Sequence, residues 1–365
     1  MSVVLFVIGM VLLVFGADLL VRGASRLAGS MGISPLVVGL TVVAFGTSSP
    51  ELAVSMQGAL ADKPDIALGN VVGSNCFNVL VVLGLSALIV PLSVDRQLIR
   101  QEVPLMLGAS VLLWWLASDG RLSRLDAAVL LALLVAYSLF VIIQSRRANG
   151  VSASSTPVET PAPAAAPSGG SRWSDHWAAN LLLMGVGLVM LVLGASWMVD
   201  SAVVFARLMG VSELVIGLTI VAIGTSLPEA ATSVMAALRG QRDMAVGNAV
   251  GSNIFNILGV LGATGLVAPS GLGVASSVIS FDLPVMIAVA FACLPVFFTG
   301  REIARWEGGL FLAYYVAYTV YLTLNAAHHD VVGPYSAVLL GFVVPLTVIT
   351  LMVLALREWI GQVRQ

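Results

Sequence analysis

The sequence AFGTSSPE at residues 44–51, followed by GNVVGSNCFN at 69–78, determines how the rest of the chain is interpreted. It recurs as AIGTSLPE at 222–229 and GNAVGSNIFN at 247–256, and 222 − 44 gives an offset of 178 residues. Of the 53 residue pairs that begin at positions 32 and 210, 32 are identical, without a gap. Chance does not produce such agreement, so the chain contains an internal duplication.

Each copy of this stretch predicts a helix that is broken inside the membrane. Glu51 follows Pro50, which has no backbone N–H to donate, and Gly46 loosens the same turn. The second copy has the same residue types at 224, 228 and 229. A break at membrane depth leaves backbone carbonyls free, and it persists only where it lines a cavity or binds something. Carbonyls, hydroxyls and a carboxylate are hard oxygen ligands, which suit sodium and calcium ions.

The two GTSxPE segments, each followed by GNxxGSNxFN, resemble the paired repeats of the sodium/calcium exchanger family, in its prokaryotic type. That family belongs to the calcium/cation antiporter superfamily. The resemblance covers both repeats and, more loosely, the ten spans around them. It implies a secondary active antiporter that works by alternating access.

The composition predicts an integral membrane protein. Of the 365 residues, 59% are hydrophobic and 10% are charged, whereas about a quarter are charged in a soluble protein. The first apolar run, residues 3–21, has no basic residues before it and is long enough to span the membrane. No cleavable signal peptide is therefore expected. A net charge of −2 argues against a nucleic-acid partner. The two cysteines have no metal-ligand or CxxC spacing, and no cofactor is expected besides the transported ions.

We expect an all-α polytopic membrane protein made of two inverted five-helix repeats plus one extra C-terminal transmembrane helix. The expected spans are 3–21, 33–60, 66–91, 103–118, 126–145, 177–199, 212–238, 244–268, 283–299, 308–325 and 335–356. The expected units are 1–145 for the first repeat, 146–176 for a flexible cytoplasmic linker, 177–327 for the second repeat, and 328–365 for the extra helix and tail. Five spans before the linker is an odd number, so the second repeat enters the membrane upside down.

Arginine placement predicts the orientation. With the N-terminus outside, 13 of the 17 Lys and Arg residues fall on the inner side and only Lys63, Arg121, Arg124 and Arg207 fall outside. The protein is therefore expected in a cell membrane, of the prokaryotic inner-membrane type, with its C-terminus in the cytoplasm.

The candidate ion ligands are the acids, hydroxyls, amides and backbone carbonyls of the two copies. An ionised glutamate at the bilayer centre is costly, and neither copy holds a basic residue to pair with Glu51 or Glu229. Hydroxyls one turn earlier share the face of each acid. By resemblance to the family, the full set that lines the ion sites is Ala44, Thr47, Ser48, Glu51, Ser74 and Asn78 in the first copy, and Ala222, Thr225, Ser226, Glu229, Ser252 and Asn256 in the second.

Each candidate also has a structural interpretation. Mid-helix serines and threonines often bond back to their own helix, and each glutamate could be protonated and bonded to a neighbouring helix. For Asn70, Asn75 and their counterparts at 248 and 253, we favour a role in holding helices together. Asp18 lies four residues before Arg22, and an ion pair on one helix explains it.

The leading hypothesis is an antiporter that exchanges sodium for calcium. The alternative is a proton/calcium antiporter that uses the same glutamates. Some relatives have aspartate where this chain has Asn78 or Asn256, which leaves the coupling ratio open and makes potassium dependence less expected. A lipid phosphatase would need Arg or His beside the acids, and neither copy has one. The partners are therefore calcium, sodium and the lipid bilayer; the oligomeric state stays open.

Overall fold

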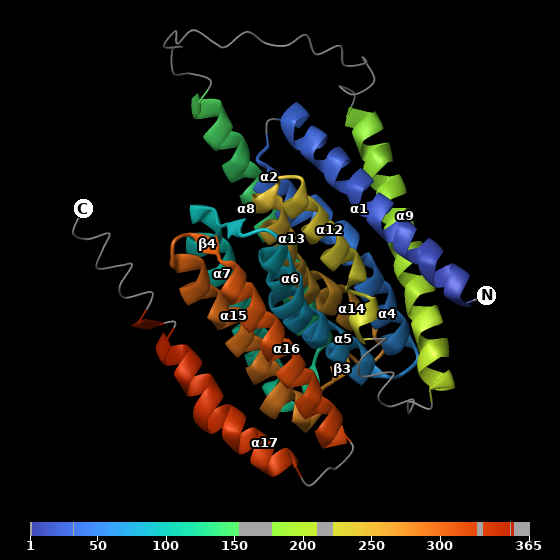
Figure 1. Ribbon diagram of the computed structural model, residues 1–365, viewed down its shortest axis with the longest axis vertical. Coiled ribbons are helices and arrows are strands. Elements are labelled where there is room, and N and C mark those ends of the chain that lie inside the picture. Colours follow the sequence, from blue (N-terminus) through green and yellow to red (C-terminus); the bar gives the residue numbers. More distant parts are fainter. Residues whose placement is uncertain are drawn as a thin grey trace.

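The chain folds into a helical bundle, seen here in a computed structural model that describes residues 2–31, 33–152, 177–209, 222–326, 331–350 and 352–353. Side chains of 146–152 lie outside the described set, as does the expected linker from 153 onward. Figure 1 shows the helices packed side by side along one long direction, with only short strands between them.

The described elements fall on both sides of the linker. In the labels, η marks a π-helical segment, except η4, which is a 3₁₀ turn. The first half contains α1 (Ser2–Met31), α2 (Pro35–Val38), η1 (Gly39–Val43), α3 (Ala44–Thr47), α4 (Ser49–Leu60), α5 (Pro64–Phe77), η2 (Asn78–Leu83), α6 (Gly84–Ile89), β1 (Leu92–Ser93), η3 (Leu98–Glu102), α7 (Val103–Leu116), η4 (Ala117–Asp119), β2 (Arg121–Leu122) and α8 (Arg124–Ser152).

The second half contains α9 (Trp177–Leu208), α11 (Ala222–Gly224), α12 (Leu227–Leu238), α13 (Arg242–Phe255), η6 (Asn256–Val260), α14 (Leu261–Val267), β3 (Leu272–Gly273), η7 (Val278–Asp282), α15 (Leu283–Phe298), β4 (Glu302–Ile303) and α16 (Arg305–Ala326). The chain continues as α17 (Val332–Val338) and η8 (Leu339–Val343), with helical residues to Thr350.

Membrane character is confirmed for the longest helices. Within the described residues, six helices are long and apolar enough to cross a membrane, and α2 to α4 make a seventh if the bent pair counts as one span. Helices also cover the expected spans 103–118 and 308–325, as α7 and α16. Part of the expected span 212–238 lies outside the described residues, and α8 extends to Ser152, beyond the expected start of the linker.

The predicted helix break is present in the first copy. α3 ends at Thr47 and α4 begins at Ser49, with a bend of 43° between the two parts of the span. Ser48 between them has φ −82° and ψ 7°, because Pro50 removes a donor from the first turn of α4. Ser226 has nearly the same backbone, φ −92° and ψ 7°, between α11 and α12. Each break therefore lies three residues before a glutamate.

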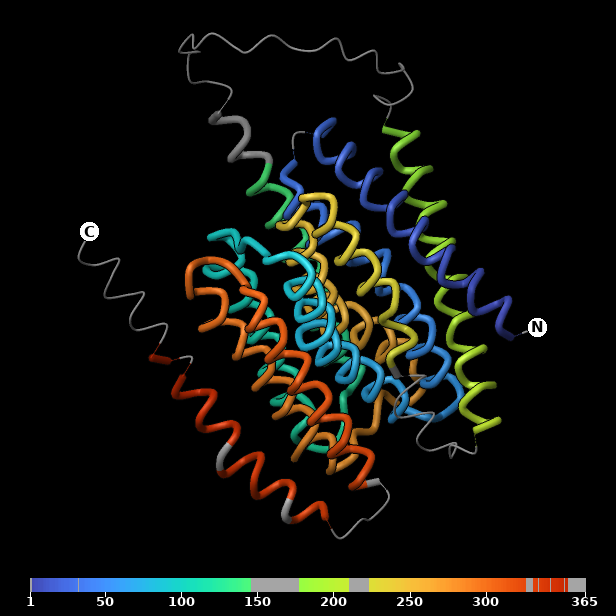
Figure 2. The backbone as a smooth tube through the Cα atoms, in the orientation of Figure 1, coloured from blue at the N-terminus to red at the C-terminus, as the bar shows by residue number. Residues whose placement is uncertain are grey.

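The centre of the bundle is formed by two continuous helical stretches. In the apolar part of α5–α6, 72% of residues are buried, and in that of α13–α14 the share is 83%. For α1 and α9 the share is only 28%. Figure 2 shows α1 and α9 together on one side of the molecule and α17 on the opposite side. The two long helices α1 and α9 therefore form an outer layer.

Backbone contact between glycines holds this outer layer together. A Cβ on Gly16 would lie 2.7 Å from the Gly187 carbonyl oxygen, and one on Gly194 would lie 2.6 Å from the Gly9 oxygen. Because contacts run from Gly9 to Gly194 and from Gly16 to Gly187, α1 and α9 are antiparallel. Small residues that allow such close approach are a usual device in membrane helix pairs.

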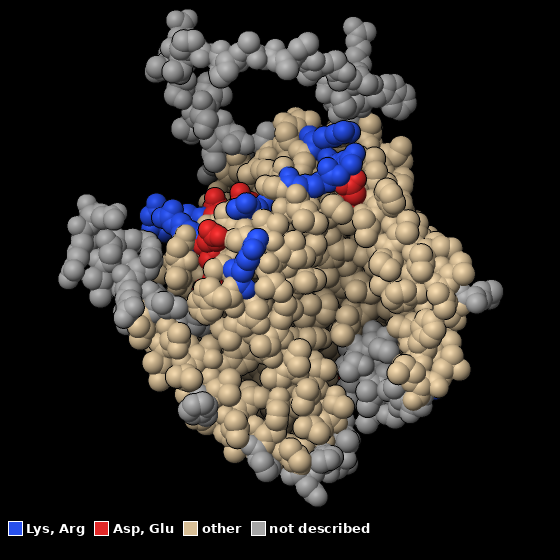
Figure 3. Space-filling view, viewed as in Figure 1, with Lys and Arg blue, Asp and Glu red and all other residues tan. Residues whose placement is uncertain are grey.

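Two short antiparallel pairs of strands tie the halves at opposite ends. β1 pairs with β4, with Leu92 opposite Ile303, and β2 pairs with β3, with Leu122 opposite Leu272. Figure 1 places β4 near one end of the bundle and β3 near the other. The end that carries β4, the Arg22–Asp18 pair on α1 and Arg239 after α12 is called the arginine-rich end; Figure 3 shows Lys and Arg gathered there on the visible face.

Candidate ion-binding site

Glu51 and Glu229 lie in the centre of the bundle, and neither side chain is exposed to solvent. Each occupies the first turn of the helix that follows a break, α4 for Glu51 and α12 for Glu229. The N-terminal end of a helix favours negative charge because its backbone N–H groups point outward. The break therefore gives each carboxylate a local stabilising environment.

Serines from the opposite half bind both carboxylates. Ser226 donates a hydrogen bond of 3.0 Å to Glu51 Oε1, and Ser48 donates one of 3.0 Å to Glu229 Oε1. Ser74 also reaches Glu51 Oε1 at 3.4 Å. Because each acid is held by the hydroxyl at the other helix break, the two breaks and their glutamates meet at one place.

Asparagines form a reciprocal frame around this place. Asn70 donates to the Glu51 carbonyl oxygen at 3.1 Å and to Ser55 Oγ at 3.0 Å. Asn248 makes the same pair of bonds, to the Glu229 carbonyl at 3.4 Å and to Ser233 Oγ at 2.9 Å. These bonds join neighbouring helices of the same half, as the packing interpretation of the two asparagines expects.

Further bonds cross between the halves. Thr47 donates to Asn248 Oδ1 and Thr225 donates to Asn70 Oδ1, both at 3.2 Å. Asn75 and Asn253 each donate to the other's backbone carbonyl at 3.3 Å. Every one of these contacts has a partner contact in which the two halves exchange roles. A contact pattern of this kind is what a two-fold relation between similar units produces.

Several buried oxygens at the site have no hydrogen-bond partner among the described residues. They are Glu51 Oε2, Glu229 Oε2, Asn78 Oδ1 and Asn256 Oδ1; Asn78 Nδ2 is also unpaired. Asp18 forms ion pairs with Arg22 and Arg239, whereas neither glutamate has a basic partner among the described residues. Leaving buried polar atoms unpaired is costly, and an unpaired buried charge is costlier still. The arrangement fits a site that a cation completes.

The other expected ligands have varied surroundings. Ser252 lies 3.5 Å from Thr47, and Asn256 donates to Asn75 Oδ1 at 3.1 Å. The Ala44 carbonyl accepts the Ser48 N–H at 3.0 Å, as in an ordinary helix, so the break leaves it less free than expected. Ala222 is the first residue of α11, and its side chain lies outside the described set.

The residues Ser55, Ser233 and Thr232 were not singled out from the sequence. Ser55 and Ser233 are identical between the copies, and that identity could have marked them as partners of the asparagines. Thr232 is buried without a hydrogen-bond partner among the residues that the structure describes, and its counterpart 178 residues earlier is Val54. Because the first copy has no hydroxyl at this position, the comparison of the two copies could not have marked Thr232.

Comparison with known proteins identifies the family of the chain. The sequence model of the family described as "Sodium/calcium exchanger protein" matches residues 1–143 and 179–324. The chain is 38% identical over 294 residues to the inner membrane protein YrbG of Escherichia coli (strain K12), covering 80% of this chain and 88% of that protein. It is 34% identical over 344 residues to the sodium/calcium exchanger MaX1 of Methanosarcina acetivorans, covering 87% and 97%.

The fold is also similar to a solved exchanger. The sodium–calcium exchanger NCX_Mj, soaked with Na⁺ and Sr²⁺, superposes with a TM-score of 0.71 at 33% identity, over 86% of this chain and 96% of that one. The matched residues include both glutamate-bearing breaks and the helices around them. The chain therefore belongs to the sodium/calcium exchanger family of multi-pass membrane antiporters.

Proposed function

We propose that this protein exchanges sodium for calcium across the membrane by alternating access. The observation that carries the proposal is the pair of fully buried glutamates. Serines bond to them across the two helix breaks, and one oxygen of each has no partner in the described ranges. Two ionised carboxylates carry a charge of −2, which one calcium ion or two sodium ions neutralise. A third sodium ion would make the exchange electrogenic.

The proposed ligands are the acids, hydroxyls, amides and carbonyls of both copies. The unpaired oxygens of Glu51, Glu229, Asn78 and Asn256 support a direct role for these four. Ser48, Ser74 and Ser226 contact the carboxylates and would share the bound ions. The remaining members are Ala44, Thr47, Ala222, Thr225 and Ser252. Hard oxygen donors of this kind suit sodium and calcium.

The two halves are proposed to be inverted five-helix repeats, residues 1–145 and 177–327. Support comes from the antiparallel contact of the equivalent helices α1 and α9, and from strand pairs that exchange partners at opposite ends of the bundle. The linker 146–176 and the extra C-terminal helix lie outside this relation. The N-terminus is proposed to face outward, because the arginine-rich end belongs in the cytoplasm.

Alternating access would come from movement of the outer layer, α1 with α9, against the central helices. The support is that these two helices are much less buried than α5–α6 and α13–α14. Bound cations neutralise the glutamates, so a loaded protein can pass through the occluded state at lower cost than an empty one. This difference couples the movement of one ion to that of the other.

The test is calcium uptake into proteoliposomes that hold purified protein. Sodium-loaded vesicles diluted into sodium-free medium should take up calcium, and uptake should collapse when sodium is equal on both sides. A pH gradient without sodium forms a second arm, and a potassium gradient a third. Uptake driven by the pH gradient alone would favour the proton/calcium alternative, because buried carboxylates can also carry protons. Uptake that no gradient stimulates would contradict antiport itself.

A further inference from the structure

One face of α12 connects the central site to the arginine-rich end. Glu229, Thr232, Ala236 and Arg239 follow one another at spacings of three, four and three residues, which keeps them on one side of a helix. Glu229 lies in the first turn of α12, and Arg239 is the residue that ends it. This face therefore spans from the buried carboxylate to the exposed end of the helix.

The Thr232 hydroxyl lies on this face without a hydrogen-bond partner among the described residues. Its side chain is fully buried. Several other helical hydroxyls in the chain bond back to their own helix; for example, Thr41 donates to the Val37 carbonyl at 2.6 Å and Ser110 to the Met106 carbonyl at 2.9 Å. A buried hydroxyl that forgoes this bond costs free energy, and folded proteins leave few such groups. Such a hydroxyl can be retained because it binds a transient ligand.

A second unpaired hydroxyl lies on the neighbouring helix. Ser86 on α6 is fully buried and has no hydrogen-bond partner in the described part of the chain, and α6 packs against α12. In the other half, Thr264 is the counterpart of Ser86 and is also buried and unpaired, on α14 beside α4. The counterpart of Thr232 is Val54. Among the described residues, the side of α12 therefore has two unpaired hydroxyls, Thr232 and Ser86, whereas the equivalent side of α4 has one, Thr264.

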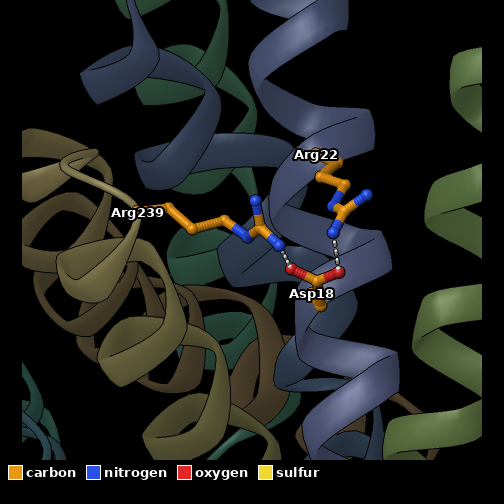
Figure 4. A network of polar contacts seen from close by, with 3 residues as sticks. All are labelled: Asp18, Arg22 and Arg239. Carbon is orange, nitrogen blue, oxygen red and sulfur yellow. Dashed lines mark ion pairs between the residues drawn. The ribbon is translucent and has the colours of Figure 1, made fainter.

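At the end of this face, an ion pair joins α12 to the outer layer. Arg239 pairs with Asp18 on α1, and Figure 4 shows Asp18 between Arg239 and Arg22. Arg22 lies 2.7 Å from Asp18 on the same helix, so only the Arg239 contact crosses between elements. Asp18 is 14% exposed. The positions equivalent to Asp18 and Arg239 are Ser196 and Ala61, which cannot form an ion pair.

We propose that ions pass between the site and the arginine-rich end along this face of α12. Thr232 and Ser86 supply oxygen to an ion that is losing its water, and the Asp18–Arg239 pair holds α1 against the end of the helix and closes the route. The opposite end has a less polar route, past Val54 and Thr264, without such a closure. The inference rests on the proposed antiport, because a route is needed only if ions reach the site.

The closure is tested by thiol labelling, which does not depend on transport. A Thr232→Cys reporter should react with a membrane-impermeant maleimide from the arginine-rich side only, and a Val54→Cys reporter from the other side only. Adding Arg239→Gln or Asp18→Asn should raise the labelling rate of the first reporter about two- to tenfold, the range for one partly exposed ion pair. It should leave the second reporter unchanged or slower. Unmodified protein gives the background, since Cys76 and Cys293 are both buried.

Arg22→Gln is the matched control for the closure. It removes an equal charge next to Asp18 but leaves the contact between α1 and α12 intact, so labelling of Thr232→Cys should not change. A charge exchange, Asp18→Arg with Arg239→Asp, should bring the rate back toward that of the unaltered pair. The closure is overturned if Arg22→Gln and Arg239→Gln act alike, or if Thr232→Cys is labelled from the opposite side.

The role of the hydroxyl is tested by transport measured from each side. Thr232→Val should raise the calcium concentration needed for half-maximal flux at the arginine-rich side about threefold or more, with little change at the other side. Thr232→Ser keeps the hydroxyl, so its flux should stay near that of the wild type. Ser110→Ala, which removes a buried but bonded hydroxyl, is the control. If Thr232→Val transports normally and is only more stable, the hydroxyl is a packing defect and the route is wrong. Sodium-driven uptake by the unaltered protein tests the antiport separately.

Discussion

At the scale of single residues, the free oxygens of the two glutamates distinguish this site from other buried acids in the chain. Glu102 is also buried, but Tyr137 donates to its Oε2 at 2.6 Å and Gln97 to its Oε1 at 2.8 Å. Both oxygens of Glu102 are therefore satisfied by the protein. Glu51 Oε2 and Glu229 Oε2 have no such partner among the described residues, and this difference supports the proposal that a cation binds them.

We expect Glu51→Gln or Glu229→Gln to reduce sodium-driven calcium uptake at least tenfold. Either change removes half of the negative charge that a calcium ion would neutralise. The variants should also lose stabilisation by calcium, because a ligand raises stability only as far as it binds the folded state. The measurement pairs vesicle flux with thermal unfolding in detergent, with and without calcium. Glu102→Gln is the control and should keep the calcium-dependent shift; a normal shift in Glu51→Gln would contradict the assignment.

The sequence indicated these acids because it repeats them. Identity at an offset of 178 residues matched Glu51 with Glu229 and Ser48 with Ser226, and in the structure the serine of each copy bonds to the glutamate of the other. The sequence could not indicate which oxygens stay unpaired, since that depends on the rotamers of neighbouring side chains. Thr232 escaped notice for a related reason: a single threonine in an apolar helix is usually bonded to its own backbone.

At the scale of elements, the glycines between α1 and α9 let two long helices touch along their backbones. Gly16→Val should destabilise the protein by about 1–3 kcal/mol and reduce transport. The added Cβ would lie 2.7 Å from the Gly187 carbonyl oxygen, and backbone atoms cannot move aside easily. Thermal unfolding and flux measure the two effects. Gly185→Ala on α9 is the control, since nothing lies within 4 Å of its added Cβ; equal losses in both variants would exclude the contact as the cause.

Sequence patterns foresaw some elements better than others. Pro50 and Gly46 pointed to the broken helix, and the bend of 43° confirms it, because a missing N–H acts locally wherever the helix lies. The π-helical segments that begin at Asn78 and Asn256 were not foreseen. An i→i+5 turn leaves no compositional mark, and it depends on how the neighbouring helices pack. The helical residues up to Ser152 were missed because Ala, Asn and Gly there resemble the linker that follows.

At the scale of the whole molecule, the repeated contacts place equivalent residues at opposite ends. Arg239 ends α12 at the arginine-rich end, whereas its equivalent Ala61 follows α4 and precedes α5, which contacts β3 at the other end. The strand pairs exchange partners in the same way. Two copies of one sequence that entered the membrane in the same direction would instead put equivalent loops on the same side. Inversion and orientation are therefore open to a single labelling experiment.

Lys63 and Gln241 are equivalent, since 241 − 63 gives the same offset of 178, and they precede α5 and α13. We expect Lys63→Cys to react with a membrane-impermeant maleimide in intact cells, and Gln241→Cys to react only after the membrane is opened. That result would support both the inverted arrangement and an outward N-terminus. Labelling of both from one side would contradict inversion, because parallel repeats keep equivalent loops together. A reversed pattern would keep inversion and overturn the orientation, which rests on arginine placement alone.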